Sequence, residues 1–248
     1  MPVAFGLHFI VALFFAIHAM RNGQQMYWLL ILFMFPLLGS VVYFVAIYLP
    51  NSRLQQGARK VVAVAAKTLD PTRELREARA AFDYTPTAQN QMRLAAALLE
   101  AGDAEESAAS YEACLKGPFA SDLEIRLGAA RAYFACNRPA DAIEQLAEVR
   151  QANPTFRPEE VALLMARALV AAGRAPEAGA EFAATWNRFG SFESLAEYAI
   201  WAAGSGDKDL SDRLRGEIQR AEQHWPKHTR ELNAPLLRRC QAAYELVR

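Results

Sequence analysis

The chain has 248 residues, enough for one domain of ordinary size with additional segments. Lysine plus arginine and aspartate plus glutamate number 27 each, so the formal net charge is zero. A chain without net positive charge does not attract the phosphate backbone of a nucleic acid electrostatically, which argues against a nucleic-acid partner. The hydrophobic fraction of 53% is slightly above the usual globular range, and the excess falls at the N-terminus.

Two apolar runs without a charged residue open the chain, at residues 2–20 and 26–49. At about 1.5 Å per residue they reach roughly 28 and 36 Å as helices, against about 30 Å for the hydrocarbon core of a bilayer. The polar residues 21–25 between them leave room only for a tight turn. The sequence therefore predicts a two-helix transmembrane hairpin over residues 1–52. Pro36 and Gly39 fall within the second helix and predict a kink or a close helix contact there.

Basic residues next to the two runs predict the topology. Arg53, Arg59 and Lys60 follow the second run, whereas Arg21 alone lies in the turn. This bias of three to one predicts that both termini lie in the cytoplasm.

The three cysteines agree with a reducing compartment. Cys114, Cys136 and Cys240 are widely spaced and form no CxxC pair or other metal spacing. Isolated thiols in a helical domain are typical small core residues.

The sequence of the second run from Trp28 onward, WLLILFMFPLLGSVVYFVAIYLP, includes Pro36, Gly39 and Tyr43. It resembles the N-terminal segment of cardiolipin synthases of the phospholipase D superfamily, over this segment only. Those enzymes need an HxKxxxxD motif twice, and this sequence has neither copy. The resemblance therefore implies a membrane anchor without the lipid chemistry.

Residues 53–86 are expected to form a juxtamembrane linker followed by a short charged helix. Asp70 and Pro71 supply an N-cap acceptor and a proline for the first turn, and the helix is expected to run to about Phe82.

A period is visible over residues 87–190. Gly102, Asn137 and Gly173 stand 35 and 36 residues apart, each between two apolar-periodic helices, and each residue tolerates the left-handed conformation that ends a helix. A small side chain stands five residues after each turn residue and a large one nine after it. These are Ser107, Ala142 and Ala178, followed by Tyr111, Leu146 and Phe182. A small side chain that faces a large one lets the two helices of a pair pack closely.

These positions resemble the tetratricopeptide repeat, a helix–turn–helix of 34 residues. In the first helices the small position is matched by Ala95, Ala130 and Ala166 and the large one by Leu98, Tyr133 and Leu169, and Pro154 matches the closing proline. The early tryptophan or leucine of that repeat is replaced by Gln91, Arg126 and Ala162.

The resemblance implies an all-α fold, in which the transmembrane hairpin is followed by a right-handed tetratricopeptide-repeat α-solenoid. Three repeats are expected over residues 87–190, and a divergent helical pair with a C-terminal capping helix over residues 191–248. The whole arrangement is similar to that of bacterial repeat proteins, which places the chain in the inner (cytoplasmic) membrane as a multi-pass protein.

The solenoid places one set of side chains on its concave face, where a protein partner would bind. The expected groove residues are Gln89, Met92, Ala96 and Leu99 in the first repeat, Glu124, Leu127, Arg131 and Phe134 in the second, and Glu160, Leu163, Arg167 and Val170 in the third. Two interpretations of the equivalent arginines Arg131 and Arg167 stay open. They pair with Glu124 and Glu160, seven residues earlier on the same face, or they anchor an acidic peptide with Met92 and Phe134 as apolar contacts.

Motifs of catalysis are missing from the sequence. It has no P-loop, no GxSxG and no GxGxxG after a strand, while His224 and His228 are separated by Pro226 and lack an adjacent carboxylate. We therefore expect no enzyme, cofactor, metal or small-molecule substrate. The leading hypothesis is a membrane-tethered scaffold that recruits a protein partner through the groove. The alternative is an accessory subunit of a lipid-metabolising or envelope-assembly enzyme, which acts through the hairpin in the bilayer.

Overall fold

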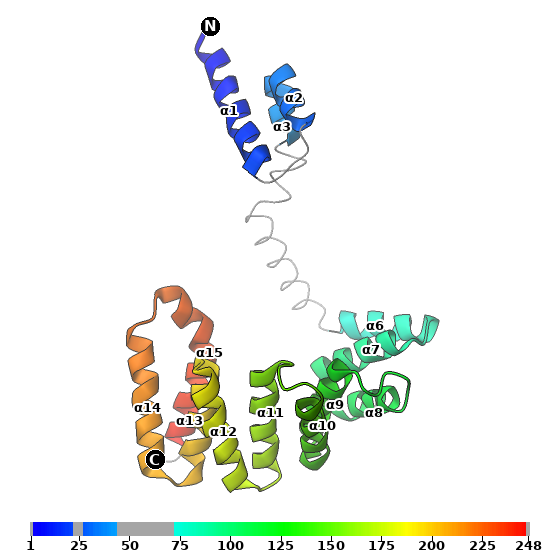
Figure 1. Ribbon diagram of the computed structural model, residues 1–248, viewed down its shortest axis with the longest axis vertical. Coiled ribbons are helices and arrows are strands. Elements are labelled where there is room, and N and C mark those ends of the chain that lie inside the picture. Colours follow the sequence, from blue (N-terminus) through cyan, green and yellow to red (C-terminus); the bar gives the residue numbers. More distant parts are fainter. Residues whose placement is uncertain (1, 22–26, 44–71, 247–248) are drawn as a thin grey trace. The chain divides into compact units, whose positions relative to one another are not determined.

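The computed structural model describes residues 2–21, 27–43 and 72–246 (Figure 1). These residues form two compact units, an N-terminal unit and a repeat unit that begins at Thr72. Every element within them is a helix, which confirms the predicted all-α class. The predicted turn at residues 22–25, the end of the second run at 44–49, the linker at 53–69 and the helix start at 70–71 lie outside the described residues.

The N-terminal unit consists of α1 (Pro2–Arg21), α2 (Tyr27–Met34) and α3 (Pro36–Tyr43). Its small core contains Phe15 of α1, Trp28 of α2 and Tyr43 of α3, whose rings meet at centroid distances of 5.4 to 5.5 Å. Large apolar side chains also cover the outside of the unit. The exposed ones are Val11, Leu13, Phe14, Ile17, Met20, Tyr27, Leu30, Phe33, Met34, Phe35, Leu38, Val41 and Val42.

The second apolar run is not one continuous helix, which corrects the expectation of a single span. The helix is interrupted at Phe35, because Pro36 has no N–H to donate and its ring disfavours helical geometry in the residue before it. The predicted close contact is present, since a Cβ at Gly39 would lie only 2.6 Å from the carbonyl oxygen of Ile31. Across the described part of the chain, no helix combines the length and the hydropathy required to span a bilayer.

The repeat unit is a row of helix pairs (Figure 1). Its helices are α6 (Arg73–Tyr84), α7 (Ala88–Ala101), α8 (Ala104–Leu115), α9 (Leu123–Ala135), α10 (Pro139–Ala152), α11 (Pro158–Ala171), α12 (Ala175–Phe189), α13 (Phe192–Ser205), α14 (Lys208–Gln223) and α15 (Lys227–Glu245). The first helices of successive pairs, α7, α9, α11 and α13, contact one another and form an inner row, which α15 continues beyond α13. The charged helix α6 packs on α7 and is therefore part of this unit.

The three predicted turn residues have the left-handed conformation. The φ angles of Gly102, Asn137 and Gly173 are 94°, 59° and 73°, and Gly206 repeats the pattern after α13 at 82°. Each of the three predicted turns is closed by a backbone bond to the residue five positions earlier, as from Arg138 N to Tyr133 O at 2.8 Å. Because every pair reverses with the same geometry, the inner helices keep a common direction.

Small and large side chains meet inside each pair as predicted. Ala130 and Ala142 are fully buried against the buried rings and branched chains of Tyr133 and Leu146. Ser107, the polar member of the small set, donates its hydroxyl to Ala95 O at 2.7 Å. A further small position was not predicted. A Cβ at Gly128 of α9 would lie 2.4 Å from Cζ of Tyr111, so α8 and α9 approach closely only because this residue is glycine.

This packing predicts opposite outcomes for two glycine substitutions. Gly128→Ala should lower the free energy of unfolding by about 1 to 2 kcal/mol, because the new methyl group displaces the buried Tyr111 ring. The matched change Gly216→Ala in α14 meets no atom within 4 Å and should raise stability by roughly 0.5 to 1 kcal/mol through helix propensity. Chemical unfolding of the full chain, followed by circular dichroism, measures both. Equal effects at the two sites would contradict the close approach of α8 and α9.

Candidate functional site: the groove of the inner helices

The concave side of the inner row carries two adjoining cavities that share Phe134 and Arg167. The polar hollow has a volume of about 700 Å³, and Arg131, Arg157, Glu159, Glu160, Leu163 and Glu193 contribute to its lining. The apolar cleft has a volume of about 970 Å³, and Val170, Phe182, Ile200, Trp201 and Gly204 contribute to its lining. Together they form one groove that crosses α9, α11 and α13.

Ion pairs connect the charged groups of the polar hollow. Arg131 of α9 donates to the carboxylate of Glu160 in α11, and Arg157 reaches Glu160 at 3.4 Å and Glu124 at 2.7 Å. Burial alone would raise the pKa of Glu160, but the hydrogen bonds and charges of Arg131 and Arg157 outweigh it and lower that pKa. Arg157 holds a φ of 38°, in the left-handed region that bulky residues seldom occupy. Its two ion pairs help to hold this backbone conformation at the entrance of α11.

A buried carboxylate lies at the wall of the apolar cleft. The side chain of Glu197 in α13 is only 4% exposed, and two guanidiniums bind it. Arg167 of α11 approaches its oxygens at 2.8 and 3.1 Å, and Arg239 of α15 at 2.8 and 3.5 Å. The three residues link three helices that are far apart in the sequence.

The ring of Trp201 forms part of the apolar wall in a fixed orientation. It stacks on Tyr198 at a centroid distance of 5.9 Å and lies 6.0 Å from the ring of Phe182. It also lies over Gly179 of α12, where a Cβ would come within 2.4 Å of the indole. These contacts leave the ring little freedom to rotate.

The predicted groove residues divide into three groups. Arg131, Phe134, Glu160, Leu163 and Arg167 line the two cavities, and the predicted Val170 joins them. Glu124 is exposed and pairs with Arg157 at the edge of the hollow. The remainder do not line either cavity: Gln89 and Ala96 are exposed, Met92 and Leu99 pack against the core, and Leu127 is fully buried within it.

The expected pairing of the arginines within their own helices is wrong. Seven residues separate the partners by about 10.5 Å along a helix axis, whereas neighbouring packed helices lie about 8 to 10 Å apart and long side chains bridge that gap. Arg131 therefore pairs with Glu160 of the next inner helix, and Arg167 pairs with Glu197 of the one after.

Sequence reasoning missed Arg157, Glu197, Trp201 and Arg239. A single glutamate within the apolar segment LAEYAIWAAG of α13 was a usable signal, because a lone acidic residue on an apolar helix needs a partner. Arg239 lies 42 residues further along the chain, and no sequence spacing connects it with Glu197.

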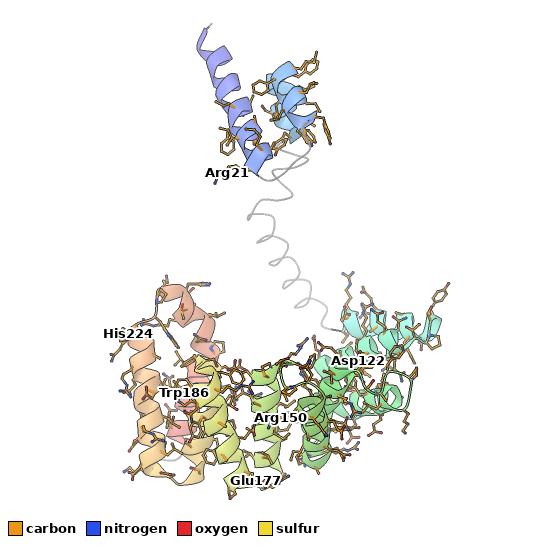
Figure 2. The ribbon with its side chains drawn as sticks, viewed as in Figure 1. Arg21, Asp122, Arg150, Glu177, Trp186 and His224 are labelled. Carbon is orange, nitrogen blue, oxygen red and sulfur yellow. The ribbon has the colours of Figure 1, made fainter. Side chains whose placement is uncertain are left out.

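Ion pairs also connect successive helices away from the groove. The second helices of the pairs, α8, α10 and α12, form the outer row. Arg150 of α10, labelled in Figure 2, binds Glu181 of α12 at 2.6 Å. This pair has the same chemistry as that of Arg131 and Glu160 but does not line the polar hollow or the apolar cleft.

Two of the thiols, Cys114 and Cys240, are poorly suited to nucleophilic chemistry. Burial raises the pKa of Cys114, and burial together with the charge of Glu197 raises the pKa of Cys240 to about 11. Both thiols are neutral at physiological pH, and the thiolate is the reactive form. They act as small core residues, as the sequence suggested.

Comparison with known proteins gives one match to a family of repeats. The family model of the tetratricopeptide repeat matches residues 98–159, from α7 through the first residues of α11. No curated protein matches the chain. The chain therefore contains a tetratricopeptide repeat within an all-helical repeat unit, and solenoids of this kind present extended concave binding surfaces.

The two groove arginines should differ in their effect on stability. Arg131→Met should lower the free energy of unfolding by less than about 1 kcal/mol, because its side chain and that of Glu160 are 38% and 41% exposed. Arg167→Met should cost about 2 kcal/mol or more, because it withdraws one of the two cations from a buried carboxylate. Chemical unfolding of both variants, followed by circular dichroism, measures the difference.

The double variant Arg167→Met with Glu197→Leu is the control, since removal of both charges should recover most of the loss. Equal destabilisation by the two single substitutions would contradict the assignment of Glu197 as a buried charge that requires its partners.

Proposed function

We propose that this protein is a membrane-tethered scaffold that captures a protein partner in the groove of its repeat unit. The observation that carries the proposal is the pair of adjoining cavities on the inner row. They combine partly exposed aromatic and aliphatic side chains with arginines, and tryptophan and arginine are among the residues that dominate binding energy at protein interfaces.

The chemistry of the groove favours binding over catalysis. Arg131, Arg157 and Arg167 each pair with a carboxylate, and Arg131 and Arg157 lower the pKa of Glu160, which favours its charged form over one poised to exchange a proton. The groove thus offers shape, apolar area and fixed charges, and we assign the protein no catalytic step.

Attachment to a bilayer is the second part of the proposal, and the N-terminal unit supports it. Residues 2–20 and 26–49 contain no charged side chain, and many large apolar side chains cover the outside of α1, α2 and α3. Exposed apolar surface of this extent in water is unfavourable and marks a surface that lipid or protein covers. We propose the inner membrane of a bacterium, with both termini in the cytoplasm, from the basic residues Arg53, Arg59 and Lys60.

Capture through the groove predicts that a single charge reversal there abolishes partner recovery. Arg131→Glu places a carboxylate beside Glu160 in the polar hollow and should lower the yield of crosslinked partners at least tenfold. The matched control Arg150→Glu makes the same reversal against Glu181 of the outer row and should leave the yield unchanged. Crosslinking in native membranes followed by mass spectrometry measures both.

Recovery of the same partners at the same yield from Arg131→Glu would refute capture through the groove. A chimera with an unrelated anchor in place of residues 1–52 tests the alternative function. Loss of the partners from this chimera, with full recovery from Arg131→Glu, would favour an accessory subunit that acts through its N-terminal segment.

The membrane proposal predicts that exposed apolar residues of the N-terminal unit hold the chain in the bilayer. Leu13→Asp with Phe33→Asp should shift the protein into the soluble fraction after an alkaline wash, since a buried aspartate costs about 2.5 to 3.5 kcal/mol in a membrane helix. The control is Tyr84→Asp with Phe119→Asp, two exposed aromatic residues of the repeat unit. Release of the wild-type protein by the same wash would contradict attachment by insertion.

A further inference from the structure

The apolar cleft lies where three inner helices end. Phe134 is next to the last residue of α9, Val170 is next to the last residue of α11, and Gly204 occupies the same position in α13. Val170 is one of the few large apolar side chains that the described part of the repeat unit exposes. Ile200 and the fixed ring of Trp201 complete a wall suited to a branched or aromatic side chain.

The guanidiniums at this wall retain donors that Glu197 does not use. A carboxylate offers about four lone-pair sites, and the four contacts from Arg167 and Arg239 occupy them. Each guanidinium has five N–H groups, so more than half of the donors of the pair are not spent on Glu197. The side chains of Arg167 and Arg239 are 33% and 55% exposed, within reach of a ligand.

The local charge balance of this cluster is positive. Two arginines face one glutamate, which leaves an excess of one positive charge beside the apolar wall. Asp207 also lines the cleft and brings the formal charge of the whole lining to zero, but its carboxylate is held at the N-terminus of α14, where it accepts the backbone N–H of Leu210 at 3.0 Å. An incoming carboxylate would therefore find N–H donors and a favourable charge at Arg167 and Arg239.

A ligand chain can continue beyond the cleft. The polar hollow shares Phe134 and Arg167 with it, so a bound segment can pass from one cavity into the other along the inner row. This favours an internal segment with an acidic side chain over a C-terminal carboxylate.

We infer that the apolar cleft receives an internal peptide segment of the partner, in which a large apolar side chain stands within two positions of an aspartate or glutamate. The apolar side chain packs on Val170, Ile200 and Trp201, and the carboxylate accepts hydrogen bonds from Arg167 and Arg239. This inference rests on the proposed function, because it names the chemistry of the partner that the groove captures.

The probe for this inference is a phage-displayed library of random twelve-residue peptides, each fused at its C-terminus so that no free terminal carboxylate is present. The full chain, purified in mild detergent, serves as the target. The expected consensus contains leucine, phenylalanine, methionine or tryptophan within two positions of an acidic residue. A consensus without an acidic residue, or failure to enrich any peptide, would overturn the inference.

Two matched glycine substitutions then locate the site. A Cβ at Gly204 meets no atom within 4 Å, so Gly204→Leu should fold normally and fill part of the cleft. It should weaken binding of the synthetic consensus peptide at least tenfold. Gly216→Leu makes the same change in α14, also with no atom within 4 Å, and should leave binding unchanged because Gly216 does not line the cleft.

A charge variant provides a second readout that does not depend on filling the cleft. Arg239→Gln should weaken the acidic peptide about tenfold while leaving its amide counterpart, with asparagine or glutamine in place of the acid, within about twofold. Equal losses for both peptides would overturn the role of the carboxylate.

The outcomes separate the inference from the proposed function. Peptides that bind Gly204→Leu as tightly as the wild type but fail to bind Arg131→Glu would overturn the cleft assignment and leave capture through the groove intact. Peptides that are indifferent to both substitutions would count against the cleft and the groove together.

Discussion

The close approach of neighbouring helices is the constraint on which the repeat unit depends. Alanine or serine at fixed positions leaves room for a large side chain of the facing helix, so backbones come near enough to exclude water. Gly128 extends the same principle to the contact between successive pairs, where the ring of Tyr111 occupies the place of a side chain. Without this close packing the inner helices would not align, and the polar hollow and the apolar cleft between them would not form.

The left-handed turns transmit this alignment along the chain. Because Gly102, Asn137 and Gly173 reverse the chain in the same way, the inner helices run in a common direction, and arginines on one reach glutamates on the next. In the apolar cleft, Arg167 and Arg239 keep N–H donors beside an apolar wall.

The two units differ in where their large apolar side chains lie. The repeat unit buries most of its apolar side chains between helices, and ion pairs such as that of Arg150 with Glu181 lie on its outer row. The N-terminal unit has a small aromatic core around Trp28, and among its side chains that the structure describes, more large apolar ones lie outside than inside. This contrast in side-chain placement, together with the uncharged runs, motivates the assignment of one unit to a lipid environment and the other to a protein partner.

Local patterns in the sequence were sufficient for the helical class, for the three left-handed turns and for the buried small and large positions. Each depends on interactions within one helix pair, where spacing along the chain translates directly into spacing in space. Similar reasoning located Arg131, Phe134, Glu160, Leu163 and Arg167 at the groove, because one face of a helix can be read from its period.

Tertiary structure alone decided how those side chains are used. Leu127 lies on the predicted face, yet it is fully buried. Arg131 pairs with Glu160 because the neighbouring inner helix is closer to Arg131 than Glu124, which lies two turns earlier in its own helix. Arg239 reaches Glu197 only because α15 packs on α13. The sequence by itself determined the repeating unit and its turns, which depend on local contacts. The ion-pair partners and the cleft depend on how successive helix pairs pack on one another. This packing brings together residues whose separation along the chain follows no regular spacing.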